Sequence, residues 1–281
     1  MQGATPLANA TSGDGMVGLT PEAFEPALLN LISGWLNGSI SGPIPVIACG
    51  MVGAKQGWVE VPYAAVPTTP LARPVPVATK SAALSVHIIP GLKQPNPADV
   101  MRGEETQIAG FMALNPGWDG VICMPGTHTK WALVSASEVV SFQTFMTGEL
   151  FATLGQHTVL RHSIAATGWD APAFLDAVDD AISRPERLAA RLFSLRADDL
   201  LNTQPKEVAR ARLSGLLIGA ELAAARPYWL GQNIAIIGAD ETSAIYASAL
   251  ARQGAPATLA DATRMTLAGL TAAHRLMKET P

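Results

Sequence analysis

Three short stretches of the chain combine chemically active side chains with glycines that allow tight turns. The first is CMPGTHTKW at residues 123–131, where an apolar run leads into one glycine, two threonines, a histidine and a lysine. Backbone N–H groups, hydroxyls and an ammonium group are together able to bind one phosphate. An ordinary polar hairpin has the same composition, so this stretch alone leaves both interpretations open. His128 by itself is typical of a turn rather than of a catalyst.

The second stretch, DVMRGEETQ at residues 99–107, concentrates charge in a chain of which only 15% of residues are charged. A carboxylate such as Glu104 or Glu105 could take the proton from a substrate hydroxyl while Arg102 binds an anionic group. The alternative is a solvated helix start, because the macrodipole favours acidic side chains in a first turn. The same two interpretations apply to Asp240 and Glu241.

The third stretch, CGMVGAKQGW at residues 49–58, follows an apolar run and contains three glycines. Lys55, Gln56 and Trp58 could form a polar pocket with one flat apolar wall. In purely structural terms, the glycines permit a turn and the tryptophan packs beneath it. The five histidines are too scattered for a local zinc site, and no Walker loop or nucleophile elbow is present.

The elements that must position these stretches follow from periodicity. Apolar residues at helical spacing behind Thr20 and Pro21 predict a helix, and continuous apolar runs predict buried strands. In 213–222, Gly215 and Gly219 predict a helix closely approached by a neighbour. The expected helices are 21–36, 100–114, one that starts near Glu149, several within 171–225, 241–252 and 262–278; the expected strands are 44–50, 83–91, a three-stranded meander after Asp119, and 233–239; segment 62–76 is expected to be a loop or an irregular edge.

Composition excludes several classes of function. The chain has 281 residues, 48% of them hydrophobic, with 19 basic and 23 acidic side chains, so a large core is expected and no basic footprint for nucleic acid or an anionic membrane. Cys49 and Cys123 lie in apolar runs, as buried thiols of a reducing compartment do. No signal peptide and no spanning segment of roughly 20 apolar residues is visible, which predicts a cytoplasmic protein.

Five stretches taken together resemble one family, the 2-dehydro-3-deoxygalactonokinases, and follow its order over nearly the entire chain. They are CGMVGAKQGWVEVPY at 49–63, DVMRGEETQ at 99–107, CMPGTHTKW at 123–131, FMTGELFATL at 145–154 and LSGLLIGAEL at 213–222. The resemblance implies an α/β protein with the two-domain fold of the actin-like ATPase (ribonuclease H-like) superfamily. We therefore expect an N-terminal sugar-acid-binding domain in residues 1–105 and a C-terminal nucleotide-binding domain in 106–281.

The resemblance also implies the reaction. The γ-phosphoryl group of ATP would be transferred, with Mg²⁺, to the 6-hydroxyl of 2-dehydro-3-deoxy-D-galactonate, a step of galactonate catabolism. ATP and the sugar acid are the partners expected, and a homo-oligomer is left open. Gly126, Thr127 and Lys130 would face the nucleotide phosphates, and Gly238 in IIGADE would lie against the adenosine.

Roles for the remaining stretches follow in the same way. Arg102 would bind the substrate carboxylate or phosphoryl group, and Glu104 or Glu105 would act as the base or on magnesium, without a choice between the two. The metal ligands are otherwise unknown. The sugar-acid pocket would include Gly50, Met51, Lys55 and Trp58.

One departure from the family pattern is visible at the start of the chain. The family opens with a strand and a first phosphate loop of the type aspartate, tryptophan, glycine, threonine or serine, which this sequence does not contain. The N-terminal domain is therefore expected to be incomplete. Because phosphoryl transfer depends on positioning and electrostatic stabilisation, the alternative function is a catalytically silent ligand-binding or interaction protein.

Overall fold

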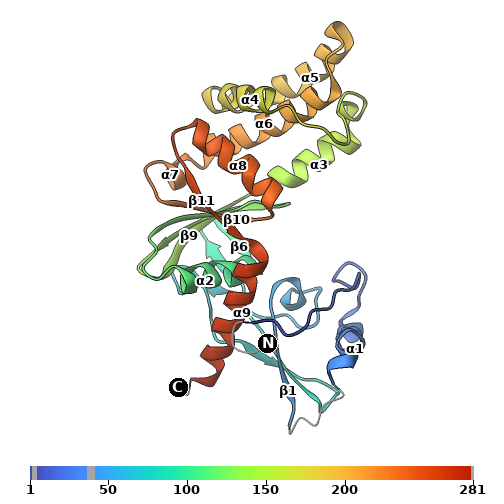
Figure 1. The fold of residues 1–281 in the computed structure, drawn as a ribbon, viewed down its shortest axis with the longest axis vertical. Coiled ribbons are helices and arrows are strands. Elements are labelled where there is room, and N and C mark those ends of the chain that lie inside the picture. Colours follow the sequence, from blue (N-terminus) through green and yellow to red (C-terminus); the bar gives the residue numbers. More distant parts are fainter. Residues whose placement is uncertain (2–4, 37–41, 280–281) are drawn as a thin grey trace. The chain divides into compact units, whose positions relative to one another are not determined.

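The computed structural model describes residues 1, 5–36 and 42–279, which form two compact units (Figure 1). The first unit comprises Met1–Trp118, Ser135–Ser141 and Ala262–Pro281, and the second comprises Asp119–Val134 and Phe142–Asp261. The boundary expected between residues 105 and 106 falls inside helix α2 (Glu104–Leu114), and the first unit continues beyond it to Trp118.

The first unit contains two small three-stranded sheets. In one, β1 and β4 are parallel and β3 pairs antiparallel with β4; in the other, β2 and β5 are parallel and β6 pairs antiparallel with β5. The expected helix over 21–36 is present as α1 with a 3₁₀ turn on either side. The elements are η1 Pro21–Ala23, α1 Phe24–Leu31, η2 Ser33–Trp35, β1 Ile44–Ala48, η3 Gly50–Gly53, β2 Ala64–Ala65, β3 Val75–Val77, β4 Leu84–Ile88, β5 Leu92–Pro95, β6 Ala98–Met101, α2 Glu104–Leu114 and α9 Ala262–Lys278.

Helices α2 and α9 of the first unit pack at very close range, although about 150 residues separate them in sequence. A Cβ atom on Gly110 would lie 1.9 Å from the carbonyl oxygen of Met265, and one on Gly269 would lie 1.9 Å from that of Thr106. Only glycine therefore fits at these two positions of the crossing. The contact joins α9 to α2, which begins at Glu104 within the DVMRGEETQ stretch.

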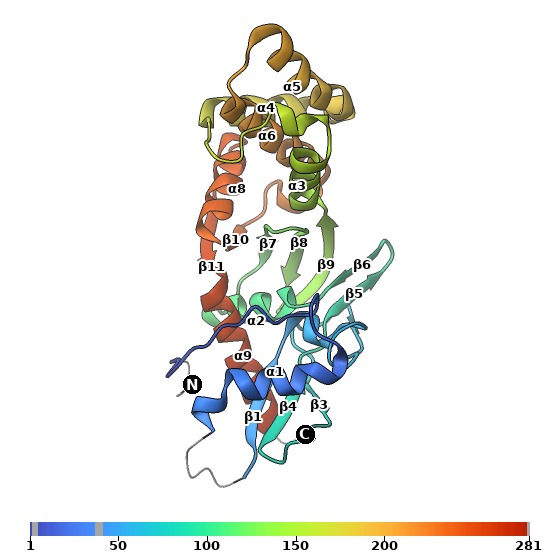
Figure 2. The ribbon, with the colours of Figure 1, turned by 90° about the vertical axis from the view of Figure 1, so that its right-hand side faces the viewer.

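The second unit is built on a five-stranded sheet in the order β11-β10-β7-β8-β9, which Figure 2 shows from left to right. β10 is parallel to β7 and to β11, whereas β7 and β8 form an antiparallel hairpin. β7, β8 and β9 are the expected meander. The elements are β7 Gly120–Met124, β8 Thr129–Ser135, β9 Glu138–Phe145, α3 Thr147–His157, η4 Val159–His162, α4 Ala171–Ser183, η5 Pro185–Arg187, α5 Leu188–Asn202, α6 Lys206–Ala224, α7 Arg226–Trp229, β10 Ile234–Gly238, α8 Asp240–Arg252 and β11 Ala257–Asp261.

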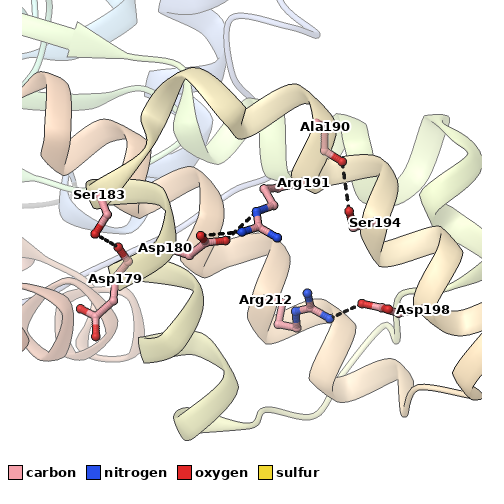
Figure 3. Close-up of polar contacts among 8 residues, drawn as sticks. All are labelled: Asp179, Asp180, Ser183, Ala190, Arg191, Ser194, Asp198 and Arg212. Carbon is pink, nitrogen blue, oxygen red and sulfur yellow. Dashed lines mark hydrogen bonds and ion pairs between the residues drawn. The ribbon is translucent and has the colours of Figure 1, made fainter.

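Helices α4, α5 and α6 form a helical layer in the second unit. As predicted, Gly215 and Gly219 of α6 are closely approached: Cβ atoms there would lie 2.3 Å and 2.6 Å from the carbonyl oxygens of Phe174 and Val178 in α4. Ion pairs join the same helices at their surface, with 2.8 Å between Arg191 Nε and an Asp180 oxygen and 2.7 Å between Arg212 Nη1 and an Asp198 oxygen (Figure 3).

Some local expectations were wrong. The side chain of Thr20 makes no capping hydrogen bond. The β5–β6 hairpin and β11 were not predicted, because strands of four or five residues that contain proline, lysine and aspartate lack a clear alternation of apolar and polar side chains. Both cysteines are free, Cys123 buried and Cys49 half-buried. Over the ranges that the structure describes, no helix is both long and apolar enough to cross a membrane.

Candidate functional site

The second unit contains a cavity of about 740 Å³ whose walls come from several elements. The 125–128 loop between β7 and β8 contributes, together with the first turns of α3 and α8, the loop before α4, and one face of α6. Its lining residues are Gly126, Thr127, Thr147, Gly148, Phe151, Ala166, Thr167, Gly168, Trp169, Arg210, Ser214, Leu217, Ile218, Glu241, Thr242, Ile245 and Tyr246.

The 125–128 loop packs directly against the first turn of α3. The backbone N–H of Glu149 donates to the carbonyl oxygen of Thr127 at 3.0 Å. A Cβ atom on Gly148 would lie 2.3 Å from the carbonyl oxygen of Gly126, so the contact requires glycine. The exposed side chains of His128 and Glu149 are in hydrogen-bond contact, with 2.5 Å between Nε2 and Oε2. Loop and helix therefore form one continuous wall.

The polar lining of the cavity includes the first turns of two helices. Thr147 and Gly148 begin α3, and Glu241 and Thr242 lie in the first turn of α8. The N–H groups of a first helical turn have no partner within the helix and carry partial positive charge. Such ends, combined with threonine hydroxyls, are suited to a phosphate or another anion.

The rest of the lining is largely apolar. Phe151 has the Arg210 guanidinium over its ring, with 5.0 Å from Cζ to the ring centroid. Trp169 packs at an angle on Phe174, with 5.0 Å between ring centroids. A cavity with a few polar groups and aromatic walls is the usual form of a small-molecule site.

Four residues were expected to contact a nucleotide, and two of them line the cavity, namely Gly126 and Thr127. Lys130 is buried on β8, opposite Met124 of β7, and is not among the lining residues. Gly238 is also absent from the lining. It ends β10, and a Cβ atom there would lie 2.7 Å from the Ser243 hydroxyl and 3.6 Å from Pro125, so it packs beside the 125–128 loop.

The residues of DVMRGEETQ form a separate cluster in the first unit. Arg102 is 8% exposed, donates from Nη2 to the carbonyl oxygen of Val61 at 2.7 Å and stacks on the ring of Tyr63, with Cζ 4.1 Å from the centroid. Its Nη1 is buried without a hydrogen-bond partner among the described residues. A Cβ atom on Gly53 would lie 2.9 Å from that nitrogen, which places the 49–58 stretch beside Arg102.

The two glutamates of this cluster differ in environment. Glu105 is fully buried and accepts hydrogen bonds from the Gly103 N–H at 2.6 Å and from the Thr106 hydroxyl at 3.0 Å. Burial raises the pKa of the Glu105 carboxyl to about 7, although the Gly103 N–H lowers it in part. Glu104 is half-buried and accepts from the Arg102 N–H at 3.0 Å.

One of the four residues expected in a sugar-acid pocket, Gly50, lies beside this cluster. Gly50 approaches Gly103, where a Cβ atom would be 3.4 Å from the Gly50 Cα. Met51 and Lys55 are exposed. Trp58 is stacked on Phe24 with 6.4 Å between ring centroids, and it lines a hollow of about 200 Å³ whose walls are largely apolar.

The sequence did not single out several residues that the cavity uses. Thr147 and Gly148 belong to FMTGELFATL, but no role was assigned to them individually. Trp169, Arg210 and Thr242 carry no local signal, because each lies in an element whose contact with the cavity is tertiary. Over the described ranges, no three His, Cys, Asp or Glu side chains are grouped so as to hold a metal ion.

Fold and cavity together define an α/β protein with a site suited to an anionic small molecule. The family model described as 2-keto-3-deoxy-galactonokinase matches residues 1–273. The chain therefore belongs to the 2-keto-3-deoxy-galactonokinase family, and both the family and the α/β class predicted from the sequence are confirmed.

Individual relatives agree with the family model. The chain is 38% identical to the probable 2-dehydro-3-deoxygalactonokinase DgoK1 of Rhizobium meliloti (strain 1021) over 282 residues, which cover 96% of this chain and 89% of the relative. It is 36% identical to the 2-dehydro-3-deoxygalactonokinase of Escherichia coli (strain K12) over 222 residues, covering 76% and 73%. A crystal structure assigned as a 2-dehydro-3-deoxygalactonokinase protein from Sinorhizobium meliloti superposes with a TM-score of 0.88 at 37% identity, covering 96% of this chain and 91% of that one.

Proposed function

We propose that this protein transfers the γ-phosphoryl group of ATP to the 6-hydroxyl of 2-dehydro-3-deoxy-D-galactonate. Its family is one of kinases, and the named relatives are 2-dehydro-3-deoxygalactonokinases. The observation that carries the proposal is the combination of family membership with a cavity on the 125–128 loop of the second unit. The two-domain fold of the actin-like ATPase superfamily and a place in galactonate catabolism are part of the same proposal.

ATP would bind in the cavity of the second unit. A volume of about 740 Å³ suits a nucleotide-sized ligand. The phosphates would lie against Gly126 and Thr127, where the first turns of α3 and α8 add partial positive charge. Gly238 and the buried Lys130 would support this loop from behind instead of contacting the nucleotide.

Magnesium fits the oxygen-rich part of this cavity. The Glu241 carboxylate and the hydroxyls of Thr127 and Thr242 are hard oxygen donors, and Mg²⁺ is usually held by one or two carboxylates together with substrate phosphates. When bound, the ion neutralises charge on the phosphate oxygens. The site would then need no larger group of protein carboxylates.

The sugar acid would be recognised by the Arg102 cluster of the first unit. A buried N–H group without a partner is costly, and a substrate carboxylate would satisfy Nη1 of Arg102. Stacking on Tyr63 and the bond to Val61 hold the guanidinium in one orientation. Gly53 lets the guanidinium pack against the backbone, Gly50 has open space around it, and Met51 and Lys55 of the same stretch are exposed.

Glu104 is the glutamate that we assign as the general base. Glu105 is fully buried and its carboxylate is held by the Gly103 N–H, so it has a structural role at the start of α2. Glu104 is half-buried and could take the proton as the 6-hydroxyl oxygen attacks the γ-phosphorus. The bond from that phosphorus to the bridging oxygen breaks, ADP leaves and the proton stays on Glu104.

The test is a coupled assay of ADP release from the full chain with MgATP and 2-dehydro-3-deoxy-D-galactonate. We expect turnover that requires both substrates, and Arg102→Gln should raise the KM for the sugar acid by at least about tenfold. Arg252→Gln, which removes an exposed ion pair to Asp179, is the matched control and should leave the KM unchanged.

Two outcomes would count against the proposal. A folded protein without substrate-dependent ADP release is not a kinase for this sugar acid. If calorimetry then shows retained binding of the sugar acid with no nucleotide affinity, the protein is a silent ligand-binding member of the family.

A further inference from the structure

A buried carboxylate in α6, Glu221, is bonded to groups from three other elements of the second unit. Its side chain is 3% exposed, and it interrupts the apolar stretch LSGLLIGAEL. The Trp131 indole N–H donates to Oε1 at 2.7 Å, the Tyr246 hydroxyl donates to Oε2 at 2.8 Å, and the Thr147 hydroxyl also donates to Oε2. A buried carboxylate is costly unless it is fully hydrogen-bonded, and this one accepts three bonds.

Two of the three donors line the cavity of the second unit, and the third lies on a strand beside it. Thr147 is the first residue of α3 and lines the cavity. The next residue, Gly148, packs directly against the 125–128 loop. Tyr246 lines the cavity from α8. Trp131 lies on β8, the strand that leaves the 125–128 loop, and is fully buried. One carboxylate therefore ties together the strand and the two helices that surround the loop.

The network also extends beyond the carboxylate. The hydroxyls of Tyr246 and Thr129 lie 3.0 Å apart, so Thr129 can donate to Tyr246 while Tyr246 donates to Glu221. Thr129 is the first residue of β8 after the loop. This arrangement suits an ionised Glu221, which accepts from all three donors, whereas a protonated carboxyl would bring an additional O–H that needs an acceptor.

Burial brings the pKa of Glu221 into the neutral pH range. Burial raises the pKa of the Glu221 carboxyl to about 7, and the bonds from Thr147, Trp131 and Tyr246 lower it in part. Glu221 acts on two other titratable groups: burial, followed by the Glu221 charge, raises the pKa of the Cys123 thiol and of the Tyr246 hydroxyl well above their usual values, so both stay neutral. Trp131, Thr129 and Thr147 do not titrate.

We propose that Glu221 is a positioning residue for nucleotide binding, whose ionised carboxylate holds the 125–128 loop, α3 and α8 in the arrangement that contacts the phosphates. This inference rests on the proposed function of the cavity. It assigns to Glu221 no contact with the nucleotide, since the carboxylate acts through Trp131, Thr147 and Tyr246.

The first test compares two tryptophans of the same core by calorimetric titration of the full chain with ADP. Trp131→Phe removes the bond to Glu221, whereas Trp229→Phe removes an equally buried indole that donates to the carbonyl oxygen of Leu222 at 2.8 Å. We expect Trp131→Phe to weaken ADP binding by about tenfold and Trp229→Phe to leave it within about twofold. Equal effects of the two substitutions would overturn the inference.

The second test measures the pH dependence of ADP binding, which a purely structural role of Glu221 would not change. Lowering the pH from 8 to 6 should weaken ADP binding to the wild type by about tenfold more than to Glu221→Gln, since glutamine cannot be protonated in this range. Titration of ADP itself is common to both proteins and cancels in the comparison. Identical pH profiles would contradict the inference.

A double-mutant cycle keeps the inference testable if Trp131→Phe does not fold. Thr147→Val should weaken ADP binding in the wild type but have no further effect in Glu221→Leu, because leucine has no oxygen that could accept the Thr147 bond. Additive effects would mean that Thr147 contacts the nucleotide directly, and the inference would fail. Absence of ADP binding to the folded wild type would instead refute the proposed function itself.

Discussion

At the scale of single residues, each unit contains one buried glutamate whose pKa burial raises to about 7, Glu105 in the first unit and Glu221 in the second. Neither is paired with a basic side chain in the hydrogen bonds and ion pairs found among the described residues. Both are instead satisfied by N–H and O–H donors. A carboxyl of this kind binds a proton more tightly in the folded than in the unfolded protein, so it links stability to pH.

For Glu105 the sign of that link can be tested. Its folded-state pKa of about 7 lies above the ordinary value of 4.5, so its contribution to stability is fully present below pH 4.5 and is lost as the pH rises toward 7. We expect the first unit of the wild type to lose unfolding free energy as the pH rises from roughly 5 to 7 because of this group. Glu105→Gln should remove that slope in pH-dependent urea unfolding. The exposed Glu186→Gln is the control, and an unchanged slope in Glu105→Gln would contradict the prediction.

Substitutions of the two adjacent glutamates, Glu104 and Glu105, should also differ in their effect on activity. Glu104→Gln should lower kcat by at least about 100-fold because it removes the proposed base, with little change in stability. Glu105→Gln should keep most of the rate, because the amide oxygen can still accept from the Gly103 N–H. Steady-state kinetics on both variants decides the assignment. A large loss in Glu105→Gln alone would reverse it.

At the scale of elements, close helix crossings built on glycine fix the layers of each unit. α2 meets α9 at Gly110 and Gly269, and α6 meets α4 at Gly215 and Gly219. Carbonyl oxygens of the neighbouring helix occupy the space where a side chain would begin. These crossings hold α2, which begins with Glu104, and α6, which contains Glu221, so element packing determines where these two carboxyls lie.

Alanine substitutions in two helices of the second unit test this packing. Gly215→Ala would place a Cβ atom 2.3 Å from the Phe174 carbonyl oxygen, so we expect a loss of about 1–3 kcal/mol or more in unfolding free energy. Gly155→Ala in α3 meets nothing within 4 Å and should instead stabilise the protein by about 0.5–1 kcal/mol, because alanine is the better helix former. Urea unfolding measures both. Similar effects at the two sites would show that the α4–α6 crossing can relax.

At the scale of the whole molecule, the chain passes between the two units four times, and each unit has its own core. The first core gathers side chains such as Val61, Val86 and Ile88, and the second gathers Cys123, Trp131 and Ile236. The last crossing follows Asp261, where the chain returns to the first unit as α9. Separate cores permit separate unfolding transitions.

A nucleotide should therefore stabilise one unit specifically. ADP at about 100 times its Kd should add about 2.7 kcal/mol to the unfolding free energy of the second unit. In calorimetry, ADP should shift the transition that Trp131→Phe lowers. The transition lowered by Gly110→Ala, which forces a Cβ atom to 1.9 Å from the Met265 carbonyl oxygen, should stay in place. A shift of both transitions would show that the units unfold together.

The sequence by itself determined the features that depend on neighbouring residues. Continuous apolar runs predicted the fully buried strands β7 and β10, and helical spacing of apolar residues predicted α1. The spacing of glycines in α6 predicted a close approach by another helix. Five ordered stretches identified the family, and the glycine and threonine of the 125–128 loop were recognised before they were found lining the cavity.

Only the tertiary structure decided which polar groups face one another. Trp131, Thr147, Glu221 and Tyr246 are up to 115 residues apart, and nothing in their local sequence indicates that three of them donate to the fourth. The same holds for the packing of α9 against α2, because all of the second unit lies between these two helices in sequence. Local patterns record the period of a helix or strand and the chemistry of a turn. Which elements meet depends on the shape and polarity of whole surfaces, and these exist only after the chain has folded.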